Sequence, residues 1–218
     1  MSATTIAPSA LDLYAAGLAG ELPELMVRRR DGSGSLVPLE RWLGPLTLAD
    51  EEVLARAAVA APVLDVGCGP GRHVHALAHR GVLALGIDIS AIAIAHARRR
   101  GAPAVEASVF AHVPNAGEWG SALLLDGNVG IGACPRTLLH RLTGLVLPGG
   151  TVLVELDPPG APTGVEQLRL EGGGSVSAWF DWAHVGVDGI APLAAAAGLA
   201  VVEAWERSGR WFAALVAP

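Results

Sequence analysis

Lysine is absent from this 218-residue chain, and its fifteen basic residues are all arginine. This absence excludes mechanisms that need a lysine amine, such as Schiff-base formation, and the lysine-containing phosphate loop of nucleotide hydrolases. With the abundant glycine and alanine, it also indicates a GC-rich, bacterial-like coding bias. The arginine runs at 28–30 and 98–100 are short, and the second is interpreted as a solvated helix end stopped by Gly101.

Cysteine is scarce, and the chain has no net positive charge. The two cysteines, Cys68 and Cys134, have no metal-ligand spacing, so we expect free thiols in a reducing cytoplasm. The formal net charge of −6 disfavours nucleic acid as a partner. No signal peptide and no apolar run of transmembrane length is expected. These features predict a cytoplasmic protein, a monomer or homodimer, that acts on a small molecule and not on nucleic acid or a membrane.

The most informative stretch is residues 63–73, VLDVGCGPGRH, in which an apolar strand runs into three glycines at alternate positions. Glycine lets the backbone turn sharply and lets a ligand come close. If a helix follows, its unpaired N–H groups face the same ligand. The pattern therefore predicts a cofactor loop at the first strand-to-helix turn of an α/β sheet.

The spacing of these glycines differs from the hydride-transfer fingerprint G-x-G-x-x-G, which would put the third glycine at Arg72 instead of Gly71. The pattern D-x-G-x-G-x-G from Asp65 resembles the first motif of class I S-adenosylmethionine-dependent methyltransferases. The resemblance implies that the loop holds the methionine end of the cofactor and that Asp65 receives its ammonium group. It assigns cofactor contacts to the loop residues Gly67, Cys68, Gly69 and Gly71.

A second apolar strand ends in Asp88, 88 − 67 = 21 positions after Gly67. An acid about 20 residues past a glycine loop can accept hydrogen bonds from ribose hydroxyls, in nicotinamide and adenosylmethionine enzymes alike. Its neighbour Ile89 is expected to pack on the adenine. The resemblance places a third-strand acid at Ser108, where a hydroxyl and the Val109 backbone would contact the adenine.

The fourth strand runs into the sequence DGNVGIG at 126–132, which fits the family's fourth motif. The resemblance implies that Asp126 and Gly127 close over the methionine, that Asp126 takes the ammonium or binds the acceptor, and that Asn128 orients a substrate oxygen. A turn rich in glycine and asparagine with no ligand is the alternative.

Strands near 63, 83, 104, 122 and 151 alternate with helical segments, which predicts a doubly wound, Rossmann-like, mostly parallel sheet. The segments 199–205 and 210–216 predict a closing antiparallel hairpin, as in class I methyltransferases. A hairpin insertion is expected near 165–184. The expected organisation is a small N-terminal cap or lid over residues 1–60 and an S-adenosylmethionine-binding domain over 61–218.

The predicted activity is in-line transfer of a methyl group from S-adenosylmethionine to oxygen or nitrogen of a small molecule, with S-adenosylhomocysteine as product. Acceptors that lose a proton need a base, and the candidates are His73, Asp126, Asp181 and His184. A helix N-terminus is expected to keep His73 neutral. The predicted substrate pocket consists of Tyr14, Trp42, Asn128, Trp179 and Trp182.

No acidic cluster suited to a metal is found in the sequence. Two alternatives stay open: a nicotinamide-dependent oxidoreductase and a non-catalytic binding protein that kept the cofactor fold.

Overall fold

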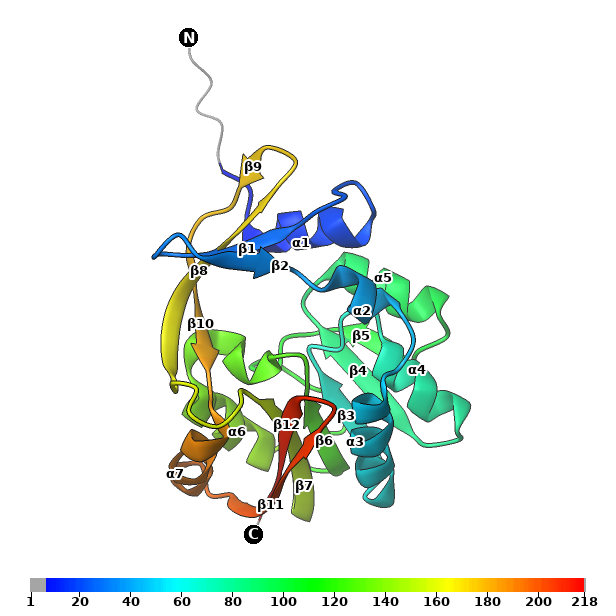
Figure 1. Cartoon of the computed structure of the whole chain (residues 1–218). Coiled ribbons are helices and arrows are strands. Elements are labelled where there is room, and N and C mark those ends of the chain that lie inside the picture. Colours follow the sequence, from blue (N-terminus) through cyan, green and yellow to red (C-terminus); the bar gives the residue numbers. More distant parts are fainter. Residues whose placement is uncertain (1–6, 218) are drawn as a thin grey trace.

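The computed structural model describes residues 7–217 and contains two sheets (Figure 1). The larger sheet has seven strands, which are, in order across it, β11 (Ala200–Arg207), β12 (Arg210–Val216), β7 (Val146–Leu156), β6 (Trp119–Leu124), β3 (Val63–Val66), β4 (Ala84–Asp88) and β5 (Ala104–Glu106). The strands from β7 to β5 run parallel, and β12 is antiparallel to both β7 and β11. The predicted α/β, mostly parallel fold class is confirmed.

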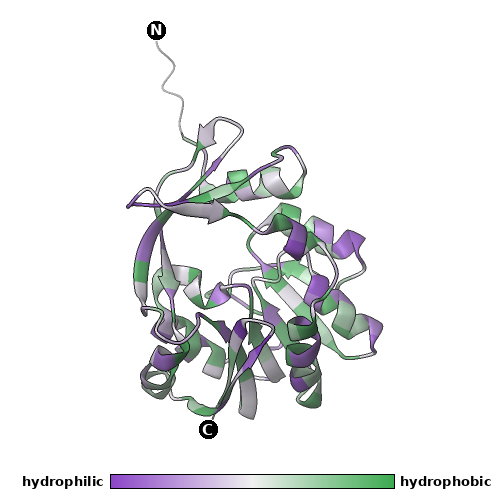
Figure 2. Ribbon diagram, viewed as in Figure 1, coloured by the Kyte–Doolittle hydropathy of each residue, from purple (hydrophilic) through white to green (hydrophobic). Residues whose placement is uncertain are grey.

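Helices cover both faces of this sheet, because each face presents a continuous apolar surface. One face packs on α3 (Leu48–Val59), α4 (Arg72–His79) and α5 (Ala91–Arg99). The other face packs on α6 (Pro135–Thr143) and α7 (Ile190–Ala196). Figure 2 shows apolar residues along the central strands and a mixture of apolar and hydrophilic residues on the surrounding helices, as burial of one helix face requires.

Side-chain caps set the starts of several helices. Ser9 and Asp12 form a capping box at α1 (Ala10–Leu18), and Thr47 and Asp50 form another at α3. Ser90 caps α5 by accepting the N–H of Ala93. Trp42 lies in the short helix α2 (Leu39–Leu43), which has no side-chain cap.

The second sheet, here called the cap sheet, joins segments far apart in sequence. Its strands are β1 (Met26–Arg29), β2 (Gly34–Leu36), β8 (Gly164–Gly172), β9 (Ser175–Val176) and β10 (Phe180–His184). Strand β8 pairs with β1 on one side and with β10 on the other. In Figure 1 this sheet and α1 lie beyond the carboxyl ends of β3, β4 and β6.

The hairpin insertion predicted near 165–184 has a second arm that is interrupted after β9 and resumes as β10. The Ser177 hydroxyl accepts the N–H of Leu170 at 2.9 Å, and the Ser177 N–H donates to the Leu170 carbonyl at 2.8 Å. A side-chain oxygen thus replaces a ladder carbonyl, and the chain turns before β10.

The two 3₁₀ segments are η1 (Asn128–Ala133), which follows β6, and η2 (Val187–Gly189), which precedes α7. No helix within residues 7–217 is long and apolar enough to cross a membrane.

Candidate active site

The loop after β3 has the backbone geometry that its glycines allow. Gly67, Gly69 and Gly71 all have positive φ angles, of 71°, 52° and 78°. A Cβ atom on Gly67 would come within 2.6 Å of the Asn128 amide nitrogen, so this position also needs glycine for space. The loop then leads directly into α4.

Gly71 has a different neighbour. A Cβ atom there would come within 2.6 Å of the Ala97 Cβ on α5. Gly71 does not line the cavity described below. The third glycine therefore permits close packing of α5 against the loop, and the structure does not bring it to the predicted cofactor site.

Asp88, at the carboxyl end of β4, is hydrogen-bonded to the same loop. Its Oδ2 accepts the Gly69 N–H at 2.9 Å, and its Oδ1 accepts the Ser90 N–H at 2.8 Å. Burial raises the pKa of Asp88, although these two bonds oppose the shift. Each carboxylate oxygen retains a second lone pair that can accept a ligand hydroxyl.

The predicted adenine end is formed by neighbouring exposed and buried groups. Ile89 is 58% exposed, which is unusual for isoleucine, and it lines the cavity. Ser108 accepts the N–H of Phe110 at 3.2 Å, and Val109 is buried beside it. The exposed aliphatic side chain of Ile89 can pack on the flat face of an adenine ring, and the adjacent Ser108 hydroxyl can bond to its polar edge.

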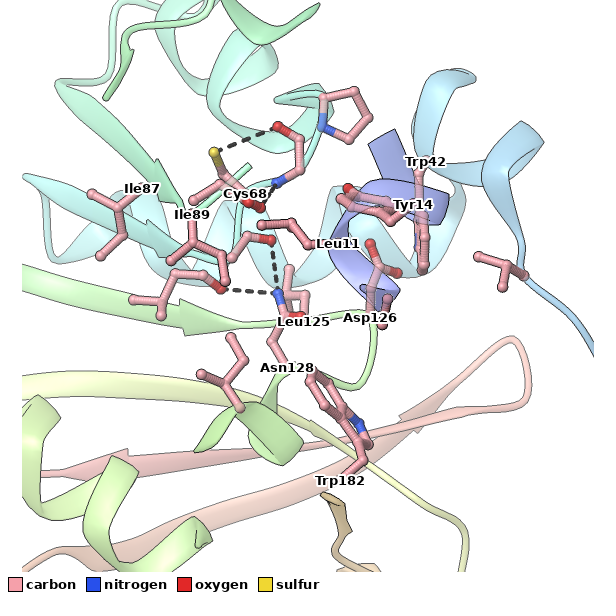
Figure 3. A pocket seen from close by; sticks show the side chains of 18 of the residues that line it. Leu11, Tyr14, Trp42, Cys68, Ile87, Ile89, Leu125, Asp126, Asn128 and Trp182 are labelled. Carbon is pink, nitrogen blue, oxygen red and sulfur yellow. Dashed lines mark hydrogen bonds between the residues drawn. The ribbon is translucent and has the colours of Figure 1, made fainter. Parts of the chain in front are cut away.

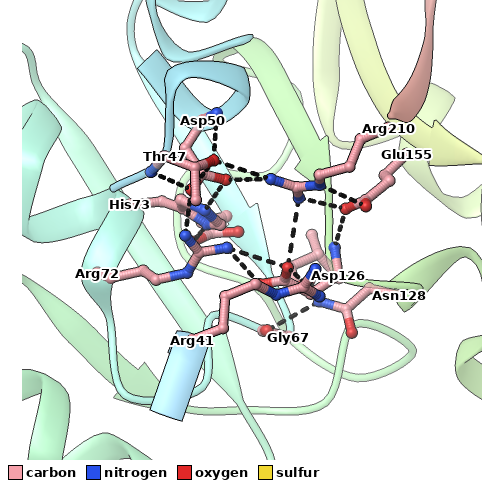
Figure 4. Close-up of polar contacts among 12 residues, drawn as sticks. Arg41, Thr47, Asp50, Gly67, Arg72, His73, Asp126, Asn128, Glu155 and Arg210 are labelled. Carbon is pink, nitrogen blue, oxygen red and sulfur yellow. Dashed lines mark hydrogen bonds and ion pairs between the residues drawn. The ribbon is translucent and has the colours of Figure 1, made fainter. Parts of the chain in front are cut away.

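Asp126, just after β6, is surrounded by arginines (Figure 4). Arg72 donates to both of its oxygens, at 3.0 and 2.9 Å, and an Arg41 nitrogen lies 3.0 Å from Oδ1. Burial would raise the pKa of Asp126, but the charges of His73, Arg72 and Arg41 outweigh it and lower the pKa. Asp126 is therefore held as an anion.

Asn128 supports the glycine loop. Its amide donates to the carbonyls of Val66 and Gly67, at 2.9 and 2.8 Å (Figure 3). The loop after β6 and the loop after β3 are thereby fixed to each other.

A buried charge network continues below Asp126. Asp50 is fully buried and bonded to Arg72, to His73 at 3.2 Å and to Arg210 at 2.7 Å. Arg210, on β12, also donates to both oxygens of Glu155, at 2.7 and 2.6 Å. The network joins α3, α4, β7 and β12 under the cavity.

The expectation of a neutral His73 is wrong. Burial lowers the pKa of His73, but the carboxylates of Asp50 and Asp65 raise it to about 9. Its Nε2 lies 3.2 Å from Asp50 and its Nδ1 lies 3.6 Å from Asp65. Two facing carboxylates outweigh the N-terminus of α4, so the imidazolium is the form the site favours.

Above these groups, one cavity of about 690 Å³ lies between the larger sheet and the cap sheet. This is within the size range of pockets that enclose small ligands. Most predicted site residues line it, namely Tyr14, Trp42, Asp65, Gly67, Cys68, Gly69, His73, Asp88, Ile89, Ser108, Val109, Asp126, Asn128 and Trp182. Tyr14 and Trp42 meet edge to face at 5.9 Å and close it on the α1 side (Figure 3).

Four other predicted residues lie off the cavity wall. Trp179 is held between the guanidinium groups of Arg30 and Arg169, 4.1 and 4.7 Å from its ring centroid. His184 instead faces Asp157 and Glu166, and Gly127 forms only the turn before η1. Asp181, an exposed residue, bonds to Gln167.

Two buried polar atoms on the cavity wall have no hydrogen-bond partner, the Asp65 Oδ2 and the Trp42 Nε1. An unpaired buried polar atom is costly, so each indicates a position where a ligand group completes the bonding. The unpaired carboxylate oxygen of Asp65 can accept a hydrogen bond from an ammonium group, as the resemblance implies. The residues present therefore fit an amino-acid-bearing adenosine cofactor.

Comparison with known proteins agrees with this geometry. Residues 63–120 match the family model described as a methyltransferase domain. This part of the chain is therefore similar to methyltransferase domains. In the solved structure of an S-adenosylmethionine-dependent methyltransferase from Bacteroides fragilis in complex with S-adenosyl-L-homocysteine, the similar fold covers 98% of each chain, with a TM-score of 0.80 and 22% identity.

Another methyltransferase of similar fold is the 1,6-didemethyltoxoflavin-N1-methyltransferase of Burkholderia thailandensis, with a TM-score of 0.56 and 18% identity over 78% of this chain and 77% of that one. Among curated relatives, the trans-aconitate 2-methyltransferase of Paracidovorax citrulli is 34% identical over 111 residues, which are 48% of this chain and 43% of that protein. An uncharacterised methyltransferase of Mycobacterium tuberculosis is 39% identical over 97 residues, 42% of this chain and 48% of that protein. The matches thus span about half the length of these curated relatives. The resemblance to class I methyltransferases is confirmed.

Several residues of the candidate site were missed by sequence reasoning. They are the buried ionic residues and the apolar cap residues, namely Arg41, Asp50, Arg72, Glu155, Arg210, Val27, Leu168, Leu170 and Phe180. Asp50 was read only as part of a helix cap, and it does accept the Thr47 N–H at 2.8 Å. No local pattern indicated that its other oxygen meets Arg210.

Proposed function

We propose that this chain transfers a methyl group from S-adenosylmethionine to an oxygen or nitrogen atom of a small molecule. One observation carries the proposal: the glycine loop, Asp88 and the cap sheet enclose a single cavity large enough for a cofactor and an acceptor together. The proposed assignments are Asp65 to the ammonium group, Asp88 to the ribose, and Ile89, Ser108 and Val109 to the adenine.

When bound, S-adenosylmethionine supplies a methyl group on a positively charged sulfur. The residues of the chain have to align the acceptor with that methyl group and exclude water. Tyr14 and Trp42 cover the loop side, and Trp182 lies beside Asn128 (Figure 3). Positioning of this kind supplies up to about 7–11 kcal/mol in the best intramolecular systems.

Calorimetry and thermal unfolding with S-adenosylhomocysteine and with NAD test the cofactor assignment. We expect stabilisation by S-adenosylhomocysteine, amounting to about 2.7 kcal/mol at a hundredfold excess over Kd, and none by NAD. A shift with NAD alone would favour a nicotinamide-dependent oxidoreductase. Cofactor binding without methyl transfer to any acceptor would favour a non-catalytic binding protein.

Asp88→Asn tests the ribose contact. The substitution keeps the shape of the side chain but removes one acceptor oxygen, so S-adenosylhomocysteine should bind about ten- to a hundredfold more weakly, from a loss of roughly 1.5–3 kcal/mol. Asp181→Asn, at an exposed position away from the cavity, is the matched control. Equal affinities for the two variants would leave Asp88 as a support for the Gly69 N–H only.

We further propose that the protein works in the cytoplasm, as a monomer or homodimer, and without nucleic acid. The net charge of −6 supports the last point, because phosphate backbones attract basic surfaces. Light scattering of the purified chain would establish its oligomeric state.

A further inference from the structure

The wall that the cap sheet presents to the cavity is apolar. Val27 on β1, Leu168 and Leu170 on β8, and Phe180 and Trp182 on β10 line it. These residues share one face, since Val27 is paired with Leu170 and Phe180 with Leu168. The acceptor therefore meets aliphatic and aromatic side chains on the side opposite the glycine loop.

Every titratable side chain on the cavity wall already has a role or a partner. The seven, within residues 7–217, are Tyr14, Asp65, Cys68, Arg72, His73, Asp88 and Asp126. His73 lies 3.2 Å from Asp50 and 3.6 Å from Asp65, and the imidazolium that these carboxylates favour has no lone pair with which to accept a proton from a ligand. Burial raises the pKa of both Tyr14 and Cys68, which keeps the phenol and the thiol protonated.

The three carboxylates on the wall are also occupied. Asp126 is bonded by Arg72 and Arg41, and these charges disfavour its protonation. Asp88 accepts two backbone N–H groups beside the proposed ribose, and Asp65 is assigned to the ammonium group. The wall thus holds no free base for the acceptor within the described part of the chain.

Free positive charge is lacking there as well. Of the cations on the wall, Arg72 is bonded to Asp50 and Asp126, and His73 lies between Asp50 and Asp65. On the cap sheet, Arg29 is bonded to Glu166 at 2.9 Å. An anionic acceptor would lose its water without gaining an unpaired cation, which is unfavourable.

We propose that the acceptor is an apolar aromatic amine or ring nitrogen that is un-ionised at neutral pH. This inference rests on the proposed function. The nitrogen lone pair forms the new N–C bond while the C–S bond breaks and its electron pair stays on sulfur. The positive charge passes from sulfur to nitrogen, and any N–H proton then leaves to water, so the protein needs no base for this step.

A matched set of probes tests the acceptor class: 2-naphthylamine, 2-naphthol and 2-naphthoic acid, which share one ring system, and trans-aconitate, a tricarboxylate. Binding is measured by calorimetry on the S-adenosylhomocysteine complex, and methyl transfer by mass spectrometry with S-adenosylmethionine. We expect 2-naphthylamine to bind at least about tenfold more tightly than 2-naphthoate, because only the carboxylate has to be buried without a partner. We also expect N-methylated product at a rate that does not rise with pH above neutrality.

The inference would be overturned if 2-naphthoate or trans-aconitate bound more tightly than 2-naphthylamine. It would also be overturned if 2-naphthol were methylated in preference to 2-naphthylamine, at a rate that rises with pH. Neither result affects the proposed methyl transfer, whereas failure to bind S-adenosylhomocysteine would refute the proposed function itself.

Leu168→Arg offers a second test, because it adds an unpaired cation to the cap wall. The affinity for 2-naphthoate should rise about tenfold in this variant and stay unchanged in the control Leu168→Met. Equal affinities in the two folded variants would contradict the charge argument, and the probe series on the unaltered protein decides the question if the arginine variant does not fold.

Discussion

Gly67→Ala tests how strictly the loop geometry is required. Gly67 has a φ of 71°, in the left-handed region that side chains disfavour. A Cβ atom there would lie 2.6 Å from the Asn128 amide nitrogen and 2.9 Å from its Cγ. The amide must move away, and it then loses its bonds to the Val66 and Gly67 carbonyls.

The expected destabilisation has two parts of known size. A residue with a Cβ atom in the left-handed backbone conformation costs about 1–2 kcal/mol relative to glycine. Each lost hydrogen bond costs about 0.5–1.5 kcal/mol. The free energy of unfolding of Gly67→Ala should therefore fall by about 2–5 kcal/mol, and S-adenosylhomocysteine should bind more weakly.

Gly81→Ala separates these two parts. Gly81 has nearly the same φ, 74°, but no atom lies within 4 Å of the position its Cβ would take. Urea unfolding of this control should show only the backbone cost of about 1–2 kcal/mol. The double variant Gly67→Ala/Asn128→Ala should be less destabilised than the sum of its single variants, because the obstructing amide is gone. Equal losses for Gly67→Ala and Gly81→Ala would refute the role given to Asn128.

Two further predictions concern the buried charges. The pKa of His73, about 9 in the folded protein, exceeds the ordinary value of about 6.5. Its stabilisation is therefore complete below pH 6.5 and lost as pH rises through 9, which amounts to on the order of 3 kcal/mol. Urea titrations should show that the free energy of unfolding falls with pH in this range in the unaltered chain and in the control His140→Gln, at an exposed position, but not in His73→Gln. The same pH dependence in all three proteins would contradict the role given to His73. Arg210→Met should cost about 3–5 kcal/mol, because it removes one of the three cationic partners of buried Asp50 and leaves the Glu155 carboxylate without its arginine. Arg210→Met/Glu155→Met should recover part of this loss in the same assay, and no recovery would show that the pair is not coupled.

Sequence reasoning succeeded where a function is encoded by neighbouring residues. The strand, its three glycines and the acid at the end of the next strand all lie within residues 63–88. The pattern depends on spacing along the chain, so the sequence could predict which residues line the glycine-loop end of the cavity, whereas their contacts with a cofactor stay a prediction. Alternation of apolar strands and helices indicated the parallel sheet for the same reason.

The cap sheet could not be read in this way, because its pairing is not local. Arg29 bonds to Glu166, 137 positions further along the chain. The sequence predicts a local hairpin of residues 25–30 with 35–38, but it does not predict that the first strand also pairs with β8, where Arg28, Arg29 and Arg30 bond to Glu171, Glu166 and Gln167. Periodicity indicates that a strand exists and does not indicate which distant strand it joins.

For the proposed methyl transfer, the buried network favours acceptor recognition by the cap sheet. Four cations, Arg41, Arg72, Arg210 and His73, face four carboxylates, those of Asp50, Asp65, Asp126 and Glu155. Because the charges balance, the floor of the cavity attracts neither anions nor cations beyond the cofactor. Buried pairs contribute little net stability, but breaking one is costly, so they hold the glycine loop and the loop after β6 in one arrangement. Discrimination among acceptors then depends on the apolar side chains of β1, β8 and β10, where a single added charge is expected to change the preferred substrate.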